Sequence, residues 1–469
     1  MRDLWIKTNP PKHGAGQWLA SIVVSFCFCS AGMGFAWTSP AFSKIKEGEV
    51  DFKLDHYEMS MIAVLGCAGR ILSPLPISYA MDIIGRKGCF IAVRVLQTAH
   101  WLIIYCFHNF WALCLARLAT GLYAGATIFV IPIYIGEATH KSIRGQVQSF
   151  LSVQFILGAV IESAIGAFLS YDNLAIASAG FDFFSFLFMF MIPESPYFQI
   201  MKEDMQGAKL SLQWLRGEQD IQEELGLIEK NMKIQLARSS KYVDLFKVKS
   251  IRKALTCVLI LMLLQRLCGV SCLIPYGSFV FPDTWYLSSN KGSIVLNCTY
   301  LIMCASSGFF IDSLGRKMLL FFSTAGACFF LTCCAIWFFL RDKMYMDVEG
   351  TEWLVIIFLI AQAAFYSTGY FYIPLLIMAE MFPMNMKAKA NALCSTIGVT
   401  VGCVVIVIFL PLTNNYGLYT NFIIYSLAAF FGAIYSTTIV ETKRKSLEQI
   451  QAILEGQRDS SSLASSQDE

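Results

Sequence analysis

Long apolar runs alternate with short polar connections along most of the chain. A helix that crosses the hydrocarbon core of a bilayer needs about 20 mainly apolar residues. Runs of this kind fall near 17–42, 59–81, 88–107, 110–135, 147–170, 174–192, 254–281, 293–311, 318–340, 353–378, 390–413 and 417–439. Because several connections have only a few residues, neighbouring helices are expected to run antiparallel. The pattern predicts an all-α protein with twelve transmembrane helices.

One long polar stretch, residues 194–253, interrupts this pattern. It is rich in charge and in helix-forming residues, which predicts short amphipathic helices outside the membrane. The stretch divides the apolar runs into six plus six. The predicted organisation is an N-terminal segment, a bundle, a helical linker, a second bundle and a tail, at 1–16, 17–193, 194–253, 254–440 and 441–469.

The composition agrees with a membrane protein, since 56% of the residues are hydrophobic and only 15% are charged. The net charge of +3 is small and gives no reason to expect a nucleic-acid partner. If the linker lies inside, the connections on that side carry roughly 26 basic residues and those on the other side about 6. Both termini are therefore predicted to be cytoplasmic.

A short charged motif occurs at the same place in each half, after the second and the eighth predicted span. The two copies are Asp82-Ile-Ile-Gly85-Arg86-Lys87 and Asp312-Ser-Leu-Gly315-Arg316-Lys317. Charges that merely follow the positive-inside rule explain the basic residues but not the shared aspartate and glycine. The two copies indicate internal duplication, which is typical of alternating-access transporters.

Further charged residues recur near span ends in both halves. Glu137 precedes Arg144 by seven residues, as Glu380 precedes Lys387, and Glu194 and Glu441 follow the sixth and twelfth spans. Acidic and basic side chains paired across helix ends can form an ionic latch that breaks and reforms as two bundles move.

These motifs resemble those of the sugar porter family of the major facilitator superfamily, and most of all its insect trehalose transporter branch. The resemblance covers nearly the whole chain. It rests on the duplicated motifs above and on Gly34-Phe-Ala-Trp37-Thr38-Ser39-Pro40, Arg117-x-x-x-Gly121-x-x-x-Gly125, Pro193-Glu-Ser-Pro196, Ala379-Glu380-Met-Phe-Pro383 and Glu441-Thr-Lys.

The resemblance implies two six-helix bundles of the major facilitator fold, with a solute site between them. It further implies facilitated uniport of a small sugar such as trehalose or a hexose, by alternating access at the plasma membrane. No cofactor or metal is expected. The oligomeric state stays open, with a monomer as the simplest expectation.

Sugar-contact positions of the family are only partly kept. Gln265, Tyr276 and Asn297 match the family pattern, whereas Arg266 and Ser271 stand where the family has amides. Ser152 occupies the usual glutamine position, and Gln154 is displaced from it by two residues. Tyr366 in the tenth span and Glu162 complete the candidate set. These departures weaken trehalose as the substrate more than they weaken transport.

Four ionisable residues lie within predicted spans where the family is uncharged: Arg70, Glu162, Asp182 and Arg266. Each costs about 2.5–3.5 kcal/mol at mid-membrane unless it is paired or hydrated. Glu162 and Arg266 differ in predicted depth by about 6 Å, so they can face each other across the cavity. Alternatively each faces water independently. Arg70 can pair with Asp182 or be hydrated.

Three functional alternatives remain. Glu162 could carry a proton, although the first span has no carboxylate, which favours uncoupled transport. Because only some of the sugar-contact positions are kept, the chain also fits a transporter-like sensor with little flux, or a carrier of an acidic solute. An enzyme is not expected, because the chain has none of the common nucleophile, phosphate-loop or metalloprotease motifs.

Overall fold

The computed structural model describes residues 14–454, apart from gaps at 141–142, 218–220, 238–242, 283, 285–287, 347, 349, 383, 443–448 and 451–452. Every regular element in the described part is a helix, which confirms the predicted all-α class. Contacts divide the chain into two compact units. The first comprises Met1–Ala237 and Ile274–Leu301, and the second Arg238–Leu273 and Ile302–Glu469.

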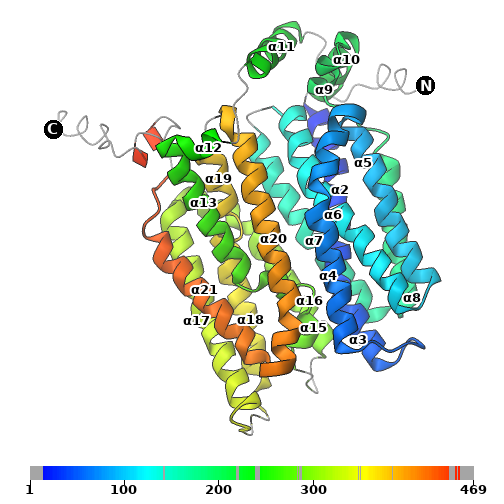
Figure 1. The fold of residues 1–469 in the computed structure, drawn as a ribbon, viewed down its shortest axis with the longest axis vertical. Coiled ribbons are helices and arrows are strands. Elements are labelled where there is room, and N and C mark those ends of the chain that lie inside the picture. The colour runs from blue at the N-terminus through cyan, green and yellow to red at the C-terminus, as the bar shows by residue number, and fades with distance from the viewer. Residues whose placement is uncertain are drawn as a thin grey trace, which may run out of the picture. The chain divides into compact units, whose positions relative to one another are not determined.

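The first six predicted spans correspond to helices of the first unit (Figure 1). These are α2 (Ala15–Ala36), α3 (Thr38–Glu47), α4 (His56–Leu72), α5 (Pro74–Cys106), α6 (Phe110–Ala138), α7 (Arg144–Phe168) and α8 (Tyr171–Phe188). The first predicted span is interrupted at Trp37 and the second at Ser73, where Pro74 and Pro76 follow. Proline at the start of a helix lacks an N–H that would be unpaired there anyway, so these positions suit a new helix.

The boundary between the second and third predicted spans falls inside α5, at Gly85. This residue has φ 83° and ψ 173°, so the chain turns sharply there. Glycine adopts a positive φ at little cost because it has no Cβ. The glycine of the first charged motif therefore makes the predicted reversal between two spans.

Helices α2 and α7 pack with their backbones in close contact. A Cβ on Gly32 would lie 2.0 Å from the carbonyl oxygen of Phe155, and one on Gly158 would lie 1.9 Å from that of Cys29. Such contacts require glycine on both helices. Small residues that let backbones approach closely are a usual means of packing transmembrane helices.

The polar stretch after the sixth span forms short helices, as predicted: α9 (Pro196–Met201), α10 (Met205–Arg216), α11 (Gln222–Ala237) and α12 (Asp244–Lys247). Trp214 and Leu215 of α10 belong to the hydrophobic core of the first unit. Arg216 donates a hydrogen bond of 2.9 Å to the carbonyl oxygen of Ala138 at the end of α6. The linker thus contains a helix, α10, that is anchored on the first unit.

The second half of the chain forms α13 (Lys249–Leu267), α14 (Val270–Leu273), α15 (Gly277–Val280), α16 (Ser289–Leu314), α17 (Arg316–Asp342), α18 (Glu352–Phe365), the π-helix η1 (Tyr366–Tyr370), α19 (Ile373–Met381), α20 (Met384–Tyr416) and α21 (Leu418–Ser436). The seventh predicted span is therefore broken between α13 and α15. The tenth contains a π-helical turn just before Pro374, an arrangement often found at functional sites.

Residues Ile274–Leu301 group with the first unit, although the sequence places them within the predicted C-terminal bundle. Ser278, in α15, shares a hydrogen bond of 2.6 Å with Ser39 in α3, and Asn290 of α16 donates one of 3.3 Å to Ser43. The predicted bounds of the two bundles stay a prediction.

Eight helices in the described part of the chain are long and apolar enough to cross a membrane: Ala15–Glu47, Pro76–Cys106, Phe110–Ala138, Phe150–Phe168, Arg316–Asp342, Glu352–Met378, Lys389–Tyr416 and Leu418–Ser436. Two of the other predicted spans, the second and the seventh, are interrupted as described above.

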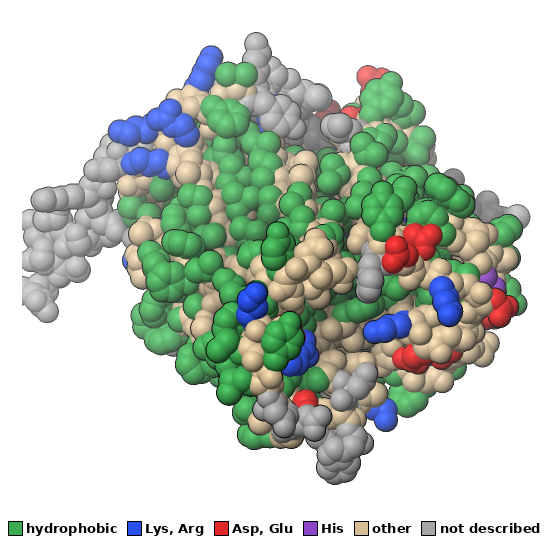
Figure 2. All heavy atoms as spheres, turned by 60° about the horizontal axis from the view of Figure 1, so that its bottom comes forward, with side chains coloured by type: hydrophobic (Ala, Val, Ile, Leu, Met, Phe, Trp, Pro, Cys, Tyr) green, Lys and Arg blue, Asp and Glu red, His purple; other side chains and the backbone are tan. Residues whose placement is uncertain are grey.

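The drawn face of the molecule carries a largely hydrophobic surface, with charged side chains gathered in small groups (Figure 2). Pairs of exposed phenylalanines occur on α8, α17 and α21: Phe183 and Phe184, Phe321 and Phe322, and Phe430 and Phe431. An apolar surface of this extent is expected of a protein whose surroundings are lipid.

Candidate functional site

The duplicated charged motif forms an equivalent cluster in each unit. In the first unit, Arg86 makes an ion pair of 2.9 Å with Glu137 at the end of α6. The backbone N–H groups of Arg86 and Lys87 donate to the carboxylate of Glu194, at 3.1 to 3.2 Å. Ser195 donates its hydroxyl to Glu137. We call these residues the first gate cluster.

The second unit repeats this arrangement with different residues. Arg316 makes an ion pair of 3.2 Å with Glu380. The N–H groups of Arg316 and Lys317 donate to Glu441, at 3.1 and 2.9 Å. Thr442 donates its hydroxyl to Glu380. These residues form the second gate cluster, and the match extends to the hydroxyl residue that follows each terminal glutamate.

The physical logic of both clusters is the same. Glu194 accepts hydrogen bonds from the first N–H groups of the helical segment that follows Gly85, and Glu441 accepts them from the helix that follows Gly315. A negative charge is favourable at the start of a helix. Gly315 has φ 84° and ψ 164°, so it turns the chain as Gly85 does. The cluster thereby joins three helix ends of one unit.

The other predicted gating residues are placed differently. Asp82 is exposed, whereas the ammonium group of Lys87 donates to the carbonyl oxygens of Phe190 and Ile192, just beyond α8. The side chains of Arg144, Asp312 and Lys387 lie outside the described ones. The predicted pairing of Glu137 with Arg144 and of Glu380 with Lys387 therefore stays a prediction.

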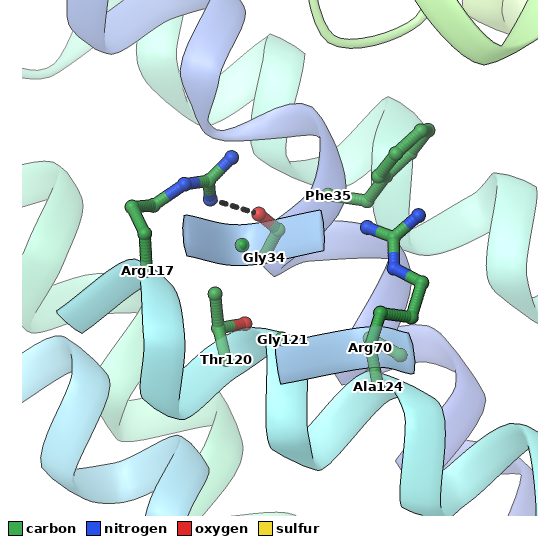
Figure 3. A pocket seen from close by; sticks show the side chains of 9 residues that line it. Gly34, Phe35, Arg70, Arg117, Thr120, Gly121 and Ala124 are labelled. Atoms are coloured by element: carbon green, nitrogen blue, oxygen red, sulfur yellow. Dashed lines mark hydrogen bonds between the residues drawn. The ribbon is translucent and has the colours of Figure 1, made fainter. Parts of the chain in front are cut away.

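Arg117 spans the interruption between α2 and α3. Its Nη1 donates to the carbonyl oxygen of Gly34 at 2.7 Å, and its Nη2 donates to the hydroxyl of Thr38. The guanidinium group also lies 5.4 Å from the ring of Trp37. Arg117 thus satisfies a carbonyl group near the end of α2, and with Arg70 of α4 it lines a small pocket (Figure 3).

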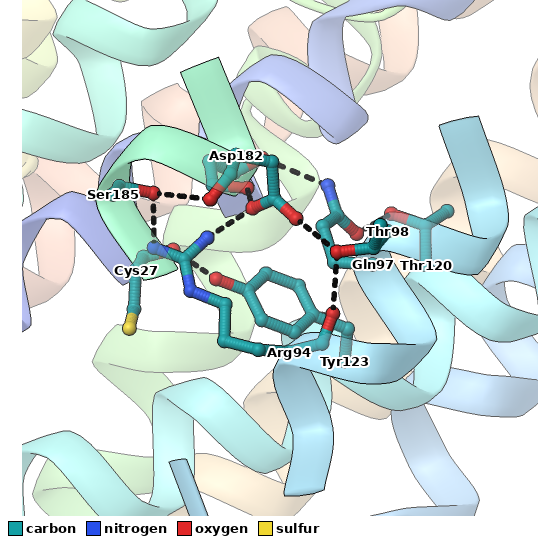
Figure 4. A network of polar contacts seen from close by, with 9 residues as sticks. Cys27, Arg94, Gln97, Thr98, Thr120, Tyr123, Asp182 and Ser185 are labelled. Atoms are coloured by element: carbon teal, nitrogen blue, oxygen red, sulfur yellow. Dashed lines mark hydrogen bonds and ion pairs between the residues drawn. The ribbon is translucent and has the colours of Figure 1, made fainter. Parts of the chain in front are cut away.

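A buried polar network lies inside the first unit, and its central ion pair differs from the pairing predicted from the sequence (Figure 4). Arg94 of α5 forms an ion pair with Asp182 of α8, and both side chains are 0% exposed. Ser30 and Thr98 donate to the same carboxylate at 2.7 and 3.0 Å. Ser185 accepts from Arg94 at 2.6 Å. The suggested partner of Asp182, Arg70, is therefore wrong.

The signal for this pair was present in the sequence. Arg94 stands within the third predicted span, 88–107. An intramembrane acidic residue normally has a basic partner, so the sequence offers both Arg70 and Arg94 as partners of Asp182.

Predicted sugar contacts of the second unit lie around the π-helix. Gln265 donates to the carbonyl oxygens of Tyr370 and Phe371 at 2.7 and 3.0 Å. Tyr366 donates weakly to the carbonyl oxygen of Gln265, at 3.5 Å. The side chains of Arg266 and Ser271 both lie next to Gly402 of α20. A Cβ on Gly402 would lie 3.4 Å from Cδ of Arg266 and 3.4 Å from the hydroxyl of Ser271. Gln265, Arg266, Ser271 and Tyr366 are thus brought together.

The remaining candidates belong to the first unit. Glu162 is 0% exposed and accepts a hydrogen bond of 2.8 Å from Ser178. Asn297 donates a hydrogen bond of 2.9 Å to Ser163, which follows Glu162 in the sequence. The candidates Asn297 and Glu162 therefore lie close together. Ser152 and Gln154 are partly exposed, and Tyr276 is buried. Glu162 lies in the first unit and Arg266 in the second, and their predicted pairing stays a prediction.

The comparisons with known proteins agree with this architecture. The model of the family described as "Sugar (and other) transporter" matches residues 24–454. The chain therefore belongs to the sugar transporter family of the major facilitator superfamily, a family of multi-pass membrane transporters, and it is not an enzyme.

Similar curated proteins are sugar transporters. The facilitated trehalose transporter Tret1 of Apis mellifera ligustica is 28% identical over 95% of this chain and 89% of its own length. Tret1 of Aedes aegypti is also 28% identical, but this chain spans 57% of it. Sugar transporter ERD6-like 7 of Arabidopsis thaliana is 28% identical over 92% of this chain and 91% of its own length.

Solved structures show the same fold. The inward open conformation of the xylose transporter XylE from E. coli matches 93% of this chain and 99% of its own, with a TM-score of 0.75 and 16% identity. XylE bound to 6-bromo-6-deoxy-D-glucose matches 94% of this chain and 100% of its own, with a TM-score of 0.71 and 15% identity. These matches support the major facilitator fold.

Proposed function

We propose that this protein is a facilitative transporter that moves a sugar across the membrane as a uniporter, by alternating access. The observation that carries this proposal is the pair of gate clusters. Each joins helix ends within one unit through an ion pair and charged hydrogen bonds, Arg86 with Glu137 and Arg316 with Glu380. Clusters of this kind keep each bundle rigid while the bundles move relative to one another.

Trehalose or a hexose is the neutral sugar to test first. Relatives named as trehalose transporters support this choice, as do Gln265 and Asn297, which match the family's sugar contacts. We place the protein in the plasma membrane, with the linker and both termini in the cytoplasm. The excess of basic residues on that side supports the orientation.

Transport of labelled trehalose and glucose into reconstituted vesicles tests the proposal. We expect saturable uptake that empty vesicles lack. Glu137→Gln and Glu380→Gln each remove the charge from a gate cluster, so each is expected to slow uptake by about tenfold, which corresponds to 1.4 kcal/mol.

Glu224→Gln is the matched control, because Glu224 pairs with Arg216 in the linker, at 2.6 Å, rather than in a gate cluster. It is expected to leave uptake within twofold of the unchanged protein. The uptake assay is repeated with disaccharides, hexoses, polyols and organic anions. If at least one of them binds saturably but none is transported, the protein is a sensor and the proposal is wrong.

A further inference from the structure

Two arginine side chains from different helices line one pocket of the first unit. The pocket is a small, partly open hollow with Arg70 of α4, Arg117 and Thr120 of α6, and Gly34 and Phe35 of α2 in its walls. Figure 3 shows the guanidinium groups of Arg117 and Arg70 on either side of Gly34. Arg70 lies 4.8 Å from the centre of the Phe35 ring.

Neither arginine forms an ion pair with a described acidic residue. Arg117 is 7% exposed, and its hydrogen bonds go to the neutral Gly34 carbonyl and the Thr38 hydroxyl. The Nε atoms of both arginines are buried without a hydrogen-bond partner. Two cationic groups therefore face one hollow with donor capacity left over.

The surrounding residues supply little compensating charge. The carboxylate of Glu162 accepts a hydrogen bond from Ser178, and it forms no ion pair with either arginine among the described side chains. Asp182 is bound by Arg94. His100 is fully buried and hydrogen-bonded to the carbonyl oxygen of Ala116, so it supplies no negative charge. Even with Glu162 ionised, Arg70 and Arg117 leave about one positive charge that lacks a counter-ion.

We propose that this pocket binds the carboxylate of an acidic sugar, such as a hexuronate. A guanidinium group binds a carboxylate through paired N–H donors, and the bond is strong where water is scarce. One excess positive charge suits a singly charged carboxylate better than a phosphate dianion. The pocket encloses too little space for a sugar ring, so a carboxylate would bind at its open mouth and the hydroxyl groups of the solute would be bound elsewhere.

This inference rests on the proposed function, and it adds an acidic group to the class of sugar that is carried. Arg70 is its specific element. Its guanidinium group contacts the ring of Phe35, whereas Arg117 also joins α2 to α3 through its hydrogen bonds to Gly34 and Thr38. Substitution of Arg70 therefore tests the acid preference with less risk to the fold than substitution of Arg117.

Competition against uptake of a labelled sugar compares D-glucuronate with D-glucuronamide, which has the same shape but no charge. We expect glucuronate to inhibit at a concentration at least tenfold lower than glucuronamide. Arg70→Gln should reduce this preference to less than twofold, and Arg70→Lys should keep part of it. Arg252→Gln, which removes an exposed arginine of α13, is the control and should keep it fully.

The same pair of compounds is tested for thermal stabilisation of the purified protein in detergent, which requires no flux. If nothing is transported but glucuronate stabilises the protein more than glucuronamide, uniport is wrong and the acid site stands. If the two compounds act equally in both assays, or if the preference survives Arg70→Gln, the acid site is wrong. If sodium chloride stabilises the purified protein as much as glucuronate does at equal concentration, the pocket binds halide ions and the proposed acid site is wrong.

Discussion

The guanidinium group of Arg94 forms an ion pair with the carboxylate of Asp182, and neither side chain is exposed. Asp182 also accepts hydrogen bonds from Ser30 and Thr98, so its pairing joins α2, α5 and α8 at one point. Through Gln97, which donates to the Ser30 carbonyl and accepts from Thr120, the network reaches the wall of the arginine-lined pocket. A charged pair in the interior of the first unit thus fixes how these helices are aligned.

Replacing one member of this pair is expected to destabilise the protein severely. Asp182→Asn leaves Arg94 buried without its counter-ion, which typically costs about 3–5 kcal/mol. The loss is measured as a lower melting temperature of the purified protein. Asp172→Asn is the matched control on the same helix, since Asp172 pairs with His108 at an exposed site and such pairs contribute about 0–1 kcal/mol. The double variant Arg94→Met with Asp182→Leu removes both charges, and failure of this variant to regain stability would mean that the pair acts by more than charge compensation.

Gly85→Ala is expected to disturb the first gate cluster. Gly85 has φ 83° and ψ 173°, a conformation that is nearly exclusive to glycine and costs another residue about 1–3 kcal/mol, and a Cβ there would lie 2.4 Å from the carboxylate of Glu194. We expect slower sugar uptake and a lower melting temperature. Gly180→Ala is the control, because a Cβ there meets nothing within 4 Å and alanine favours the helix. Equal effects of the two substitutions would contradict the role given to Gly85.

Comparison of Gln265→Ala with Gln154→Ala distinguishes a structural amide from one that contacts only the sugar. Gln265 donates to two carbonyl groups at the end of the π-helix, so its loss should lower both stability and the affinity for sugar. Gln154 has no hydrogen bond to another described residue and is partly exposed. Gln154→Ala should therefore change the KM for sugar, by about tenfold if one hydrogen bond is lost, without changing the melting temperature. Unchanged KM in Gln154→Ala would remove it from the site.

The sequence was a good guide to the helices and to the gate clusters. Apolar runs near 20 residues locate spans because the bilayer requires that length, and the two charged motifs share a spacing that the structure turns into equivalent clusters. The breaks at Trp37 and Ser73 and the π-helix at Tyr366–Tyr370 were not predicted. These irregularities lie within apolar runs, where hydropathy carries no signal for local changes in backbone hydrogen bonding.

Pairing between charges was harder to predict than their presence. The sequence marks Asp182 as an unusual charge, but choosing Arg94 over Arg70 requires knowing which faces of α4, α5 and α8 meet. The position of Asn297 beside Ser163 has the same cause, since the segment Ile274–Leu301 groups with the first unit. Single-sequence patterns define which face of one helix is polar, and not which partner it meets.

Sugar uptake is expected to be independent of the proton gradient. Helix α2 contains no aspartate or glutamate, and the buried carboxylate of Glu162 is held by Ser178. With a gradient of one pH unit, a carrier that moves one proton per sugar accumulates its solute about tenfold, because one pH unit is worth 1.36 kcal/mol. A uniporter only equalises the concentrations. We therefore expect the same final level of labelled sugar in vesicles with and without an uncoupler, and the same result for Glu162→Gln. Accumulation that the uncoupler abolishes, and that Glu162→Gln also lacks, would instead identify Glu162 as a proton carrier.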